Sequence, residues 1–227
     1  MLIALLLFQL ATSPEKPLFD GKTLKGWHVA ARPADQGKTF WTVRDGEIVA
    51  DSIGHKDHDY VWLVSDREYG DFDLVLEVKS DPTAPGNSGI QVRSRYDSEK
   101  GWMHGPQIDI HPPTPWRTGL VYDETYEARR WVFPSLPDWK IDESQGPKQW
   151  KWHADGWNEI RIACNGTLIR TWVNGYPIAD YDGKGHLDNE AHRKRNAGLR
   201  GHIALQLHAK DEVRLAFRNI RIRTHNR

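Results

Sequence analysis

Hydrophobic and polar residues alternate with a period of two along much of the chain. The clearest example is the segment 72–78, FDLVLEV, in which every second residue is apolar and the residues between include Asp73 and Glu77. Similar alternation occurs in SGIQVRSRY at 88–96, QIDIH at 107–111 and VRLAFRNIRIR at 213–223. Side chains of a strand point alternately to its two faces, so this period predicts strands with one buried face.

Turn signals separate these segments at short intervals. Asp45-Gly46, Asn165-Gly166 and Asn174-Gly175 each lie between apolar runs and predict β-hairpins. Only residues 188–196 are expected to form a short surface turn or helix. Many short strands with almost no helix predict an all-β fold, a β-sandwich or jelly roll made of two antiparallel sheets.

The chain offers no obvious boundary between domains. Its 227 residues contain no linker rich in Pro, Gly or Ser, which predicts one domain over residues 14–227. Residues 123–156 are rich in Trp, Pro and charge. A loop of this length in a compact domain is usually functional or disordered, and its aromatic content favours an ordered binding loop.

The first 13 residues, MLIALLLFQLATS, are mostly apolar. The run is too short to cross a bilayer as a helix, so no transmembrane helix is expected. It fits the apolar part and small-residue end of a secretory signal, although the usual basic start is missing. We expect a signal peptide or hydrophobic leader and a periplasmic or extracellular protein; a buried strand or helix is the alternative.

Composition narrows the range of partners. Lys plus Arg and Asp plus Glu both number 31, so the net charge gives no reason to expect nucleic acid or an anionic membrane surface as a partner. The 11 Trp residues can fill a core, and some can stack on the apolar faces of sugar rings. Cys164 is the only cysteine, which excludes an intrachain disulfide, and we expect it to be a buried thiol.

Several segments together resemble the 3-keto-disaccharide hydrolase family. The segments are LFDGKTLKGW at 18–27, WTVRDGEIVA at 41–50, FDLVLEVKS at 72–80 and NSGIQVRSR at 87–95, and WNEIRI, VNGYPIADY, GHIALQLH and VRLAFRNIRIR follow in the same order as in the family. The resemblance extends from about residue 18 to residue 224.

This resemblance implies a fold and a reaction. The fold is a concanavalin A-like β-sandwich jelly roll. The substrate is a glycoside already oxidised to a ketone at C3, so that the C2 proton is acidic and the C1 oxygen can leave by β-elimination. Hydration of the resulting enone completes a net hydrolysis. An ordinary glycosidase instead uses two carboxylates around an oxocarbenium-like transition state.

The chain departs from the family at one place. Relatives usually have a Glu-x-Gln pair on the strand after the Asn-Ser-Gly-Ile segment, whereas this chain has Gln107-Ile108-Asp109. A shift of two residues is one strand period, so the carboxylate stays on the same face. The Gln-x-His-Gly ending of the relatives appears here as Gln206-Leu207-His208-Ala209.

The reaction needs a base for the C2 proton, a cation or metal for the enolate, and help for the leaving oxygen. Polar residues on one face of three strands are the natural candidates. We expect the catalytic residues to be Asp109, His111, Arg93 and His208. We expect the substrate-binding residues to be Gln91, Arg95, Gln107, Gln206, Trp102, Trp116 and Trp131.

Asp109 and His111 leave two roles open, because the pair can act as base or hold a divalent metal. An ordinary surface charge or ion pair is the alternative for Arg93. The cluster His55, Asp57, His58 and Asp59 has the residue types of a metal site. We expect it to be a solvated loop, because adjacent loop residues seldom converge on one ion.

Two classes of function remain open, and both have an oligosaccharide or glycoside as partner. The first is an enzyme that cleaves 3-keto-glycosides. The second is a non-catalytic carbohydrate-binding module on the same fold, since one fold supports many functions. A conventional glycosidase is a weaker third, because the chain has no Glu-x-Asp-x-x-Glu segment. The aglycone, the linkage and the oligomeric state are left open.

Overall fold

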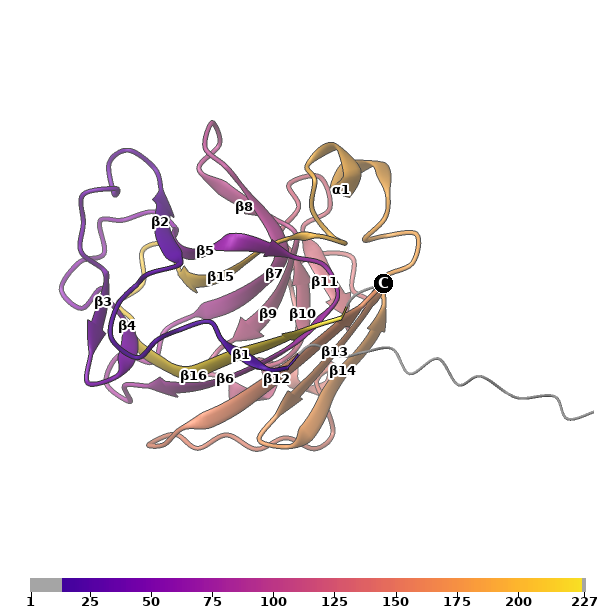
Figure 1. The fold of residues 1–227 in the computed structure, drawn as a ribbon. Coiled ribbons are helices and arrows are strands. Elements are labelled where there is room, and N and C mark those ends of the chain that lie inside the picture. Colours follow the sequence, from indigo (N-terminus) through magenta and orange to yellow (C-terminus); the bar gives the residue numbers. More distant parts are fainter. Residues whose placement is uncertain (1–13, 226–227) are drawn as a thin grey trace, which may run out of the picture.

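The computed structural model describes residues 14–225, which form two packed antiparallel sheets (Figure 1). The predicted two-sheet, all-β sandwich is therefore confirmed. The leader expected at residues 1–13 lies outside the described residues. Within the described part of the chain, no helix is long and apolar enough to cross a membrane.

The first sheet carries both ends of the described chain. Its strand order is β14-β13-β12-β6-β16-β4-β3, and β1 pairs with β16. The bounds are β1 Lys16–Pro17, β3 Trp41–Arg44, β4 Glu47–Asp51, β6 Phe72–Ser80, β12 Asn158–Asn165, β13 Leu168–Val173, β14 Tyr176–Asp182 and β16 Arg214–Thr224.

The second sheet has the order β11-β10-β9-β7-β15-β5-β2, and β8 pairs with β7. The bounds are β2 Trp27–Ala31, β5 Val61–Tyr69, β7 Ser88–Asp97, β8 Trp102–His104, β9 Pro106–Ile110, β10 Val121–Asp123, β11 Arg130–Phe133 and β15 Gly201–Leu207. β8, β10 and β11 are three or four residues long, too short to give a periodic signal in the sequence.

Alternating side chains of both sheets fill the core between them. Leu74 and Leu76 of β6 are fully buried, as their alternation predicted, and Ile108 and Leu205 meet them from the second sheet. Burial of each such side chain contributes about 1.5–3 kcal/mol. The hairpin predicted at Asp45-Gly46 is present, with both residues in the left-handed region that a type I′ turn requires.

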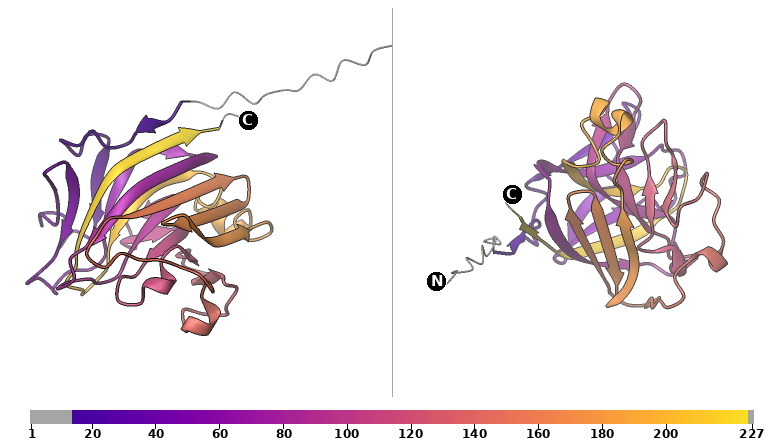
Figure 2. Two further views of the ribbon diagram at one scale, coloured as in Figure 1. Left: turned by 90° about the horizontal axis from the view of Figure 1, so that it is seen from below. Right: turned by 90° about the vertical axis from the view of Figure 1, so that its right-hand side faces the viewer.

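The few helical turns lie in the connections. They are the 3₁₀ turns η1 Pro115–Arg117 and η2 Glu143–Gln145 and the helix α1 Glu190–Lys194, which falls within the predicted range 188–196. Both views place α1 beside the hairpin of β7 and β8 (Figures 1 and 2). Arg195, directly after α1, reaches this hairpin: its guanidinium lies 3.0 Å from His104 Nε2 and 3.7 Å from Asp97.

A bulge in β7 breaks the alternation that the sequence pattern predicted there. Arg93 has φ of 51°, and the β7–β15 register shifts between His202 and Ala204 of the partner strand. An extra residue in one strand reverses the facing of the residues that follow. As a result Ser94, not Arg93, lies on the side of Gln91, and the Ser94 hydroxyl donates to Gln91 Oε1 at 3.0 Å.

The side chain of Arg93 therefore does not share a groove with Gln91, which corrects the sequence-based expectation. It is fully buried and donates to Gly70 O at 2.7 Å, Gly166 O at 2.6 Å and Asp71 Oδ1 at 2.9 Å. Gly70 and Asp71 lie in the turn from β5 to β6, which joins the two sheets, and Gly166 lies in the β12–β13 hairpin of the first sheet. The guanidinium therefore ties β7 of the second sheet to both turns.

This clamp leads to a stability prediction. Arg93→Met leaves two carbonyls and a carboxylate without their charged donor, and we expect a loss of about 3 kcal/mol or more in the free energy of unfolding. Arg95→Met is the matched control, because its half-exposed pair with Glu68 contributes about 1 kcal/mol or less. Urea denaturation measures both. An Arg93→Met protein that is as stable as wild type would contradict the clamp.

Candidate active site on the second sheet

A cavity of about 350 Å³ opens on the face of the second sheet that points away from the core. Side chains of β8, β9, β10, β11 and β15 and of adjoining segments line it. They are Tyr60, Asn87, Trp102, Gln107, Asp109, Arg117, Tyr122, Glu124, Arg129, Trp131, Trp139, Gln206 and His208. A hollow of about 530 Å³ on the first sheet is instead lined by ion-paired surface groups such as Arg214 and Asp81.

Three glutamines from neighbouring strands form the floor of the cavity. Gln91 Nε2 and Gln206 Nε2 each donate to Gln107 Oε1 at 2.8 Å. Because Gln107 Oε1 accepts both bonds, the Gln107 amide nitrogen is left to donate elsewhere. Gln206 Oε1 is buried without a hydrogen-bond partner among the described residues. The floor thus offers an amide donor and an amide acceptor, a combination that suits a sugar hydroxyl.

The glycine of the Asn-Ser-Gly-Ile segment makes this floor possible. Gly89 lies opposite Asp109 in the β7–β9 ladder, and a Cβ added to it would lie 2.3 Å from Gln107 Cδ. The Gln107 side chain therefore passes over Gly89, where any larger residue would displace it. Ser88 supports the same strand junction by donating its hydroxyl to Gln206 O at 2.6 Å.

Asp109 and Arg117 form a buried ion pair beside the amides. Asp109 Oδ2 lies 3.2 Å from Arg117 Nε, yet neither atom has a hydrogen bond of good geometry among the described residues. Burial raises the pKa of Asp109 to about 6, which outweighs the lowering effect of Arg117. At neutral pH Asp109 is thus an ionised carboxylate that is more basic than usual.

A second carboxyl lines the cavity. Glu124 is buried, and that burial, together with the charge of Asp123, raises its pKa to about 8. Its backbone carbonyl accepts a hydrogen bond from Trp102 Nε1 at 2.7 Å. The Arg129 guanidinium lies 5.1 Å from the centre of the same Trp102 ring. Tryptophan, arginine and carboxyl group therefore form one side of the cavity.

A chain of polar contacts forms another side. Asp211 Oδ2 lies 3.3 Å from His208 Nδ1, and His208 Nε2 lies 3.2 Å from the Tyr60 hydroxyl. The Tyr60 ring stacks on Trp62, which is buried in a small apolar cluster on this face of the sheet. A carboxylate, an imidazole and a phenol in sequence can move a proton toward the cavity or away from it.

The structure brings together six of the predicted site residues. Gln107, Asp109, Gln206 and His208 line the cavity, as do Trp102 and Trp131. The Trp131 ring lies 5.1 Å from the Arg117 guanidinium. Of the three strands expected to direct polar side chains into one groove, β9 and β15, which lie on either side of β7, supply cavity residues, and the roles of these residues stay predictions.

Other predicted site residues lie elsewhere. Gln91 is the third glutamine of the floor, where it holds Gln107 but does not itself line the cavity. Arg93 is the clamp between turns, and Arg95 pairs with Glu68 at 2.7 Å. Trp116 packs in the core, where a Cβ on Gly146 would touch its ring at 2.7 Å. These positions correct the expectation that Arg93, Arg95 and Trp116 face the sugar.

His111 also does not line the cavity. Its Nδ1 accepts from Thr114 N at 3.1 Å and lies 2.7 Å from the Thr114 hydroxyl. Burial and the charge of Arg117 lower its pKa to about 4. Among the described residues, His111 and Asp109 do not join a group of three convergent metal ligands. The structure therefore gives no support to a metal held by this pair.

The cluster at 55–59 does not converge on one point either. His58 is buried, with Nδ1 2.8 Å from Asp59 O and Nε2 3.1 Å from Asp211 O, while Asp57 pairs with Lys38. We expected the whole cluster to be a solvated loop. This expectation is wrong for His58, because its ring packs against Phe40 and is buried.

Sequence reasoning missed seven cavity residues. They are Tyr60, Asn87, Arg117, Tyr122, Glu124, Arg129 and Trp139. Glu124, Arg129 and Trp139 belong to the long segment that was expected to bind ligand, and Asn87 belongs to the Asn-Ser-Gly-Ile motif. For Arg117 the only signal was its place in the Pro-rich turn after β9.

An amide floor, buried carboxyls and aromatic walls on a jelly roll define a carbohydrate-related domain. The chain belongs to the family of 3-keto-α-glucoside-1,2-lyase-like domains, whose signature it matches over residues 14–223. This confirms the family resemblance seen in the sequence. None of the proteins with curated descriptions matches the chain.

Solved structures share the fold. Two proteins of Parabacteroides distasonis, both provisionally described as glycosyl hydrolases, superpose with TM-scores of 0.59 and 0.57 at 19% and 25% identity. The alignments cover 93% of this chain in both cases, and 94% and 99% of the other chains. Domain 4 of a Geobacillus stearothermophilus arabinanase, solved with arabinotriose, aligns at a TM-score of 0.55 and 10% identity over 94% of this chain and 92% of its own.

The raised pKa of Asp109 predicts a specific dependence of stability on pH. The folded-state pKa of about 6 exceeds the ordinary value of 3.8, so the folded protein binds this proton more tightly. Wild type should therefore lose stability relative to Asp109→Asn as the pH rises from about 4 to about 6, by on the order of 3 kcal/mol. Urea denaturation of both proteins across this range measures the difference. A constant difference would mean that the carboxyl has an ordinary pKa.

Proposed function

We propose that this protein cleaves 3-keto-glycosides by removing the C2 proton and eliminating the C1 oxygen. The observation that carries the proposal is the Asp109–Arg117 pair at the cavity. In a 3-keto sugar the acidic C2–H and the C3 carbonyl are on adjacent carbons. A catalyst therefore needs a base and a cation side by side, and these two side chains have that arrangement.

Asp109 acts as the base in this proposal. Its carboxylate is ionised at neutral pH, and its Oδ2 has no hydrogen bond of good geometry to a donor among the described residues. Arg117 stabilises the enolate oxygen that forms when the proton leaves, and its Nε, 3.2 Å from Asp109 Oδ2, also has no hydrogen bond of good geometry among the described residues. The Trp131 ring beside the guanidinium keeps water from this part of the cavity.

The departing C1 oxygen needs a proton donor on another side of the ring. The Tyr60 hydroxyl, supported by His208 and Asp211, lines the cavity and can supply it. Glu124 is a second buried donor group at the cavity. In the hydration step the same groups can take the proton of a water molecule that adds to C1 of the enone, while Asp109 returns its proton to C2.

The amide floor holds the sugar in place. Gln206 Oε1 and Asn87 Oδ1 are buried acceptors without partners among the described residues. An unpaired buried polar group costs about 1–3 kcal/mol, which a bound hydroxyl would recover. Trp102 and the exposed Trp139 offer ring faces at the sides of the cavity. These features also fit the second candidate, a carbohydrate-binding module without turnover.

Turnover of a 3-keto-glucoside tests the enzyme. We expect the aglycone to be released and a conjugated enone to form transiently, which ultraviolet absorption detects, with a rate that rises through pH about 6 as Asp109 ionises. Asp109→Asn should lower the rate by about a hundredfold or more, and His208→Ala by a smaller factor. Asp57→Asn, a carboxylate on an exposed loop, is the matched control and should leave the rate unchanged.

Two outcomes would count against this proposal. Full activity of both Asp109→Asn and His208→Ala would remove the site assignment. Tight calorimetric binding of unoxidised glycans, with no release from any 3-keto substrate with or without added divalent metal, would favour the binding module.

Hydrogen exchange tests the base separately from the elimination. In deuterated water, a working base should exchange the C2 hydrogen of a 3-keto sugar that has no leaving group.

The apolar leader at residues 1–13 supports a periplasmic or extracellular location in this proposal. Expression of the full chain with cell fractionation tests it. The protein should appear in the periplasm or medium, and replacement of Leu5 and Leu6 by Asp should retain it in the cytoplasm. Equal cytoplasmic retention of both proteins would contradict the location.

A further inference from the structure

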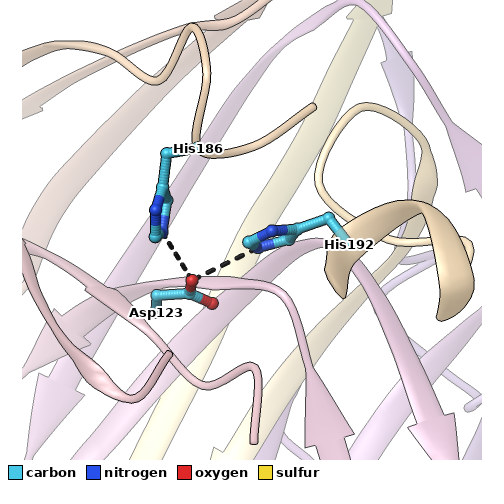
Figure 3. Close-up of side chains that lie close together, drawn as sticks. All are labelled: Asp123, His186 and His192. Atoms are coloured by element: carbon cyan, nitrogen blue, oxygen red, sulfur yellow. Dashed lines mark hydrogen bonds and ion pairs between the residues drawn. The ribbon is translucent and has the colours of Figure 1, made fainter. Parts of the chain in front are cut away.

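A buried cluster of two histidines and an aspartate lies apart from the cavity. His186 Nε2 lies 2.6 Å and His192 Nε2 lies 3.2 Å from the same oxygen, Asp123 Oδ2 (Figure 3). Asp123 belongs to β10, whereas both histidines belong to the segment between β14 and β15. Its neighbours Tyr122 and Glu124 line the cavity, so strand alternation directs Asp123 to the opposite face.

Hydrogen bonds fix the orientation of the His192 ring. Asn189 Oδ1 accepts from His192 N at 3.0 Å as the cap of α1, which identifies this atom as the amide oxygen. The same oxygen lies 3.1 Å from His192 Nδ1, so Nδ1 must carry a proton and donate it. In a neutral ring Nε2 then has a lone pair directed at a carboxylate oxygen.

The Thr125 hydroxyl does not remove this conflict. Its Oγ1 lies 3.1 Å from His192 Nε2 and can donate to it, but Asp123 Oδ2 still lies 3.2 Å from the same lone pair. The backbone N–H of Thr125 donates to Asp123 Oδ1 at 2.9 Å. That bond occupies one carboxylate oxygen and leaves the other, Oδ2, to face both imidazoles. A cation between these atoms would turn repelling lone pairs into ligands.

We propose that Asp123, His186 and His192 bind a divalent transition metal of the zinc type, a site separate from the candidate active site. The three donor atoms lie within 4.8 Å of one another, and ligands of a tetrahedral zinc are about 3.3 Å apart, so small rotations of the side chains would bring them to coordinating positions. Two imidazole nitrogens and one carboxylate oxygen are an ordinary zinc set, and the Asn189 contact is the outer partner that such histidines have.

The metal would link a connection between the sheets to the short strand β10. Asp123 and His192 are fully buried, whereas 17% of the His186 side chain is exposed, which leaves a route for the ion. The Thr125 hydroxyl is the nearest further donor. Since Tyr122 of β10 and Glu124, the residue directly after β10, line the cavity, the metal would hold one wall of the cavity in place.

Titration of the metal-free, untagged full chain with Zn²⁺ tests the site. Calorimetry should show one equivalent bound, Co²⁺ alone should give the visible absorption of a tetrahedral site, and the melting temperature should rise with Zn²⁺. His186→Ala and Asp123→Asn should weaken binding by about a hundredfold or more. Asn189→Ala should weaken it by about ten- to a hundredfold, as loss of an outer partner does.

Two histidine variants serve as controls. His55→Ala, on an exposed loop, and His111→Ala should both bind one equivalent as wild type does. If His192 or Asp123 variants fail to fold, the variant of the partly exposed His186 decides the outcome.

The proposal is overturned if wild type shows no saturable Zn²⁺ or Co²⁺ binding, which would mean that hydrogen bonds alone hold this cluster. It is also overturned if His186→Ala binds like wild type, or if His111→Ala alone abolishes binding.

Discussion

Three glutamines share one oxygen atom, and the candidate active site is built on this contact. Gln91 and Gln206 both donate to Gln107 Oε1, although the three residues come from β7, β15 and β9. All three side chains are almost completely buried on a sheet face that points away from the core. An amide group in such a place costs about 1–3 kcal/mol if it loses its partner, so each glutamine holds the others in one conformation.

The shared oxygen also constrains the backbone. The two bonds exist only while β7, β9 and β15 keep their register, and Gly89 must have no side chain so that Gln107 can pass over it. The bulge at Arg93 lies directly beyond this region. It lets the far end of β7 direct a guanidinium to the turns at Gly70 and Gly166 without moving Gln91 out of the floor. β7 thus holds the floor of the cavity through Gln91 and links two turns of the sandwich through Arg93.

The sequence predicted the fold correctly and identified about half of the residues that line the cavity. Period two predicted correctly that Gln107 and Asp109 share a face, and that Gln206 and His208 do, because these strands are regular where the residues lie. The pattern failed at Arg93, because a bulge is one residue that alternation cannot reveal. It also failed at Trp116, whose burial depends on contact with Gly146, about thirty residues later in the chain.

Residues supplied by connections could not be placed from the sequence. Arg117 reaches Asp109 because η1 folds back over the end of β9, with the backbone N–H of Gly119 donating to Asp109 O at 2.9 Å. His186 and His192 reach Asp123 from much farther along the chain, 63 and 69 residues after it. The sequence indicated that 123–156 was an unusual segment, yet long-range contacts alone decide which of its side chains face the cavity.

The carboxylate of Asp109 lies two residues away from the position that the family resemblance implies. The sequence resemblance implies a carboxylate at the first residue of a Glu-x-Gln pair. This chain has Gln107 at that place, and Asp109 follows two residues later on the same face. Two residues along a strand are about 6.8 Å, comparable with the width of a sugar ring. A carboxylate displaced by that amount would meet a different carbon or a differently seated ring. Here Asp109 Oδ2 lies 3.2 Å from Arg117 Nε, so the base of the proposed reaction has a cation beside it. In that reaction the Gln107 amide, fixed by its two glutamine neighbours, would orient the ring so that C2 rather than C1 faces the carboxylate.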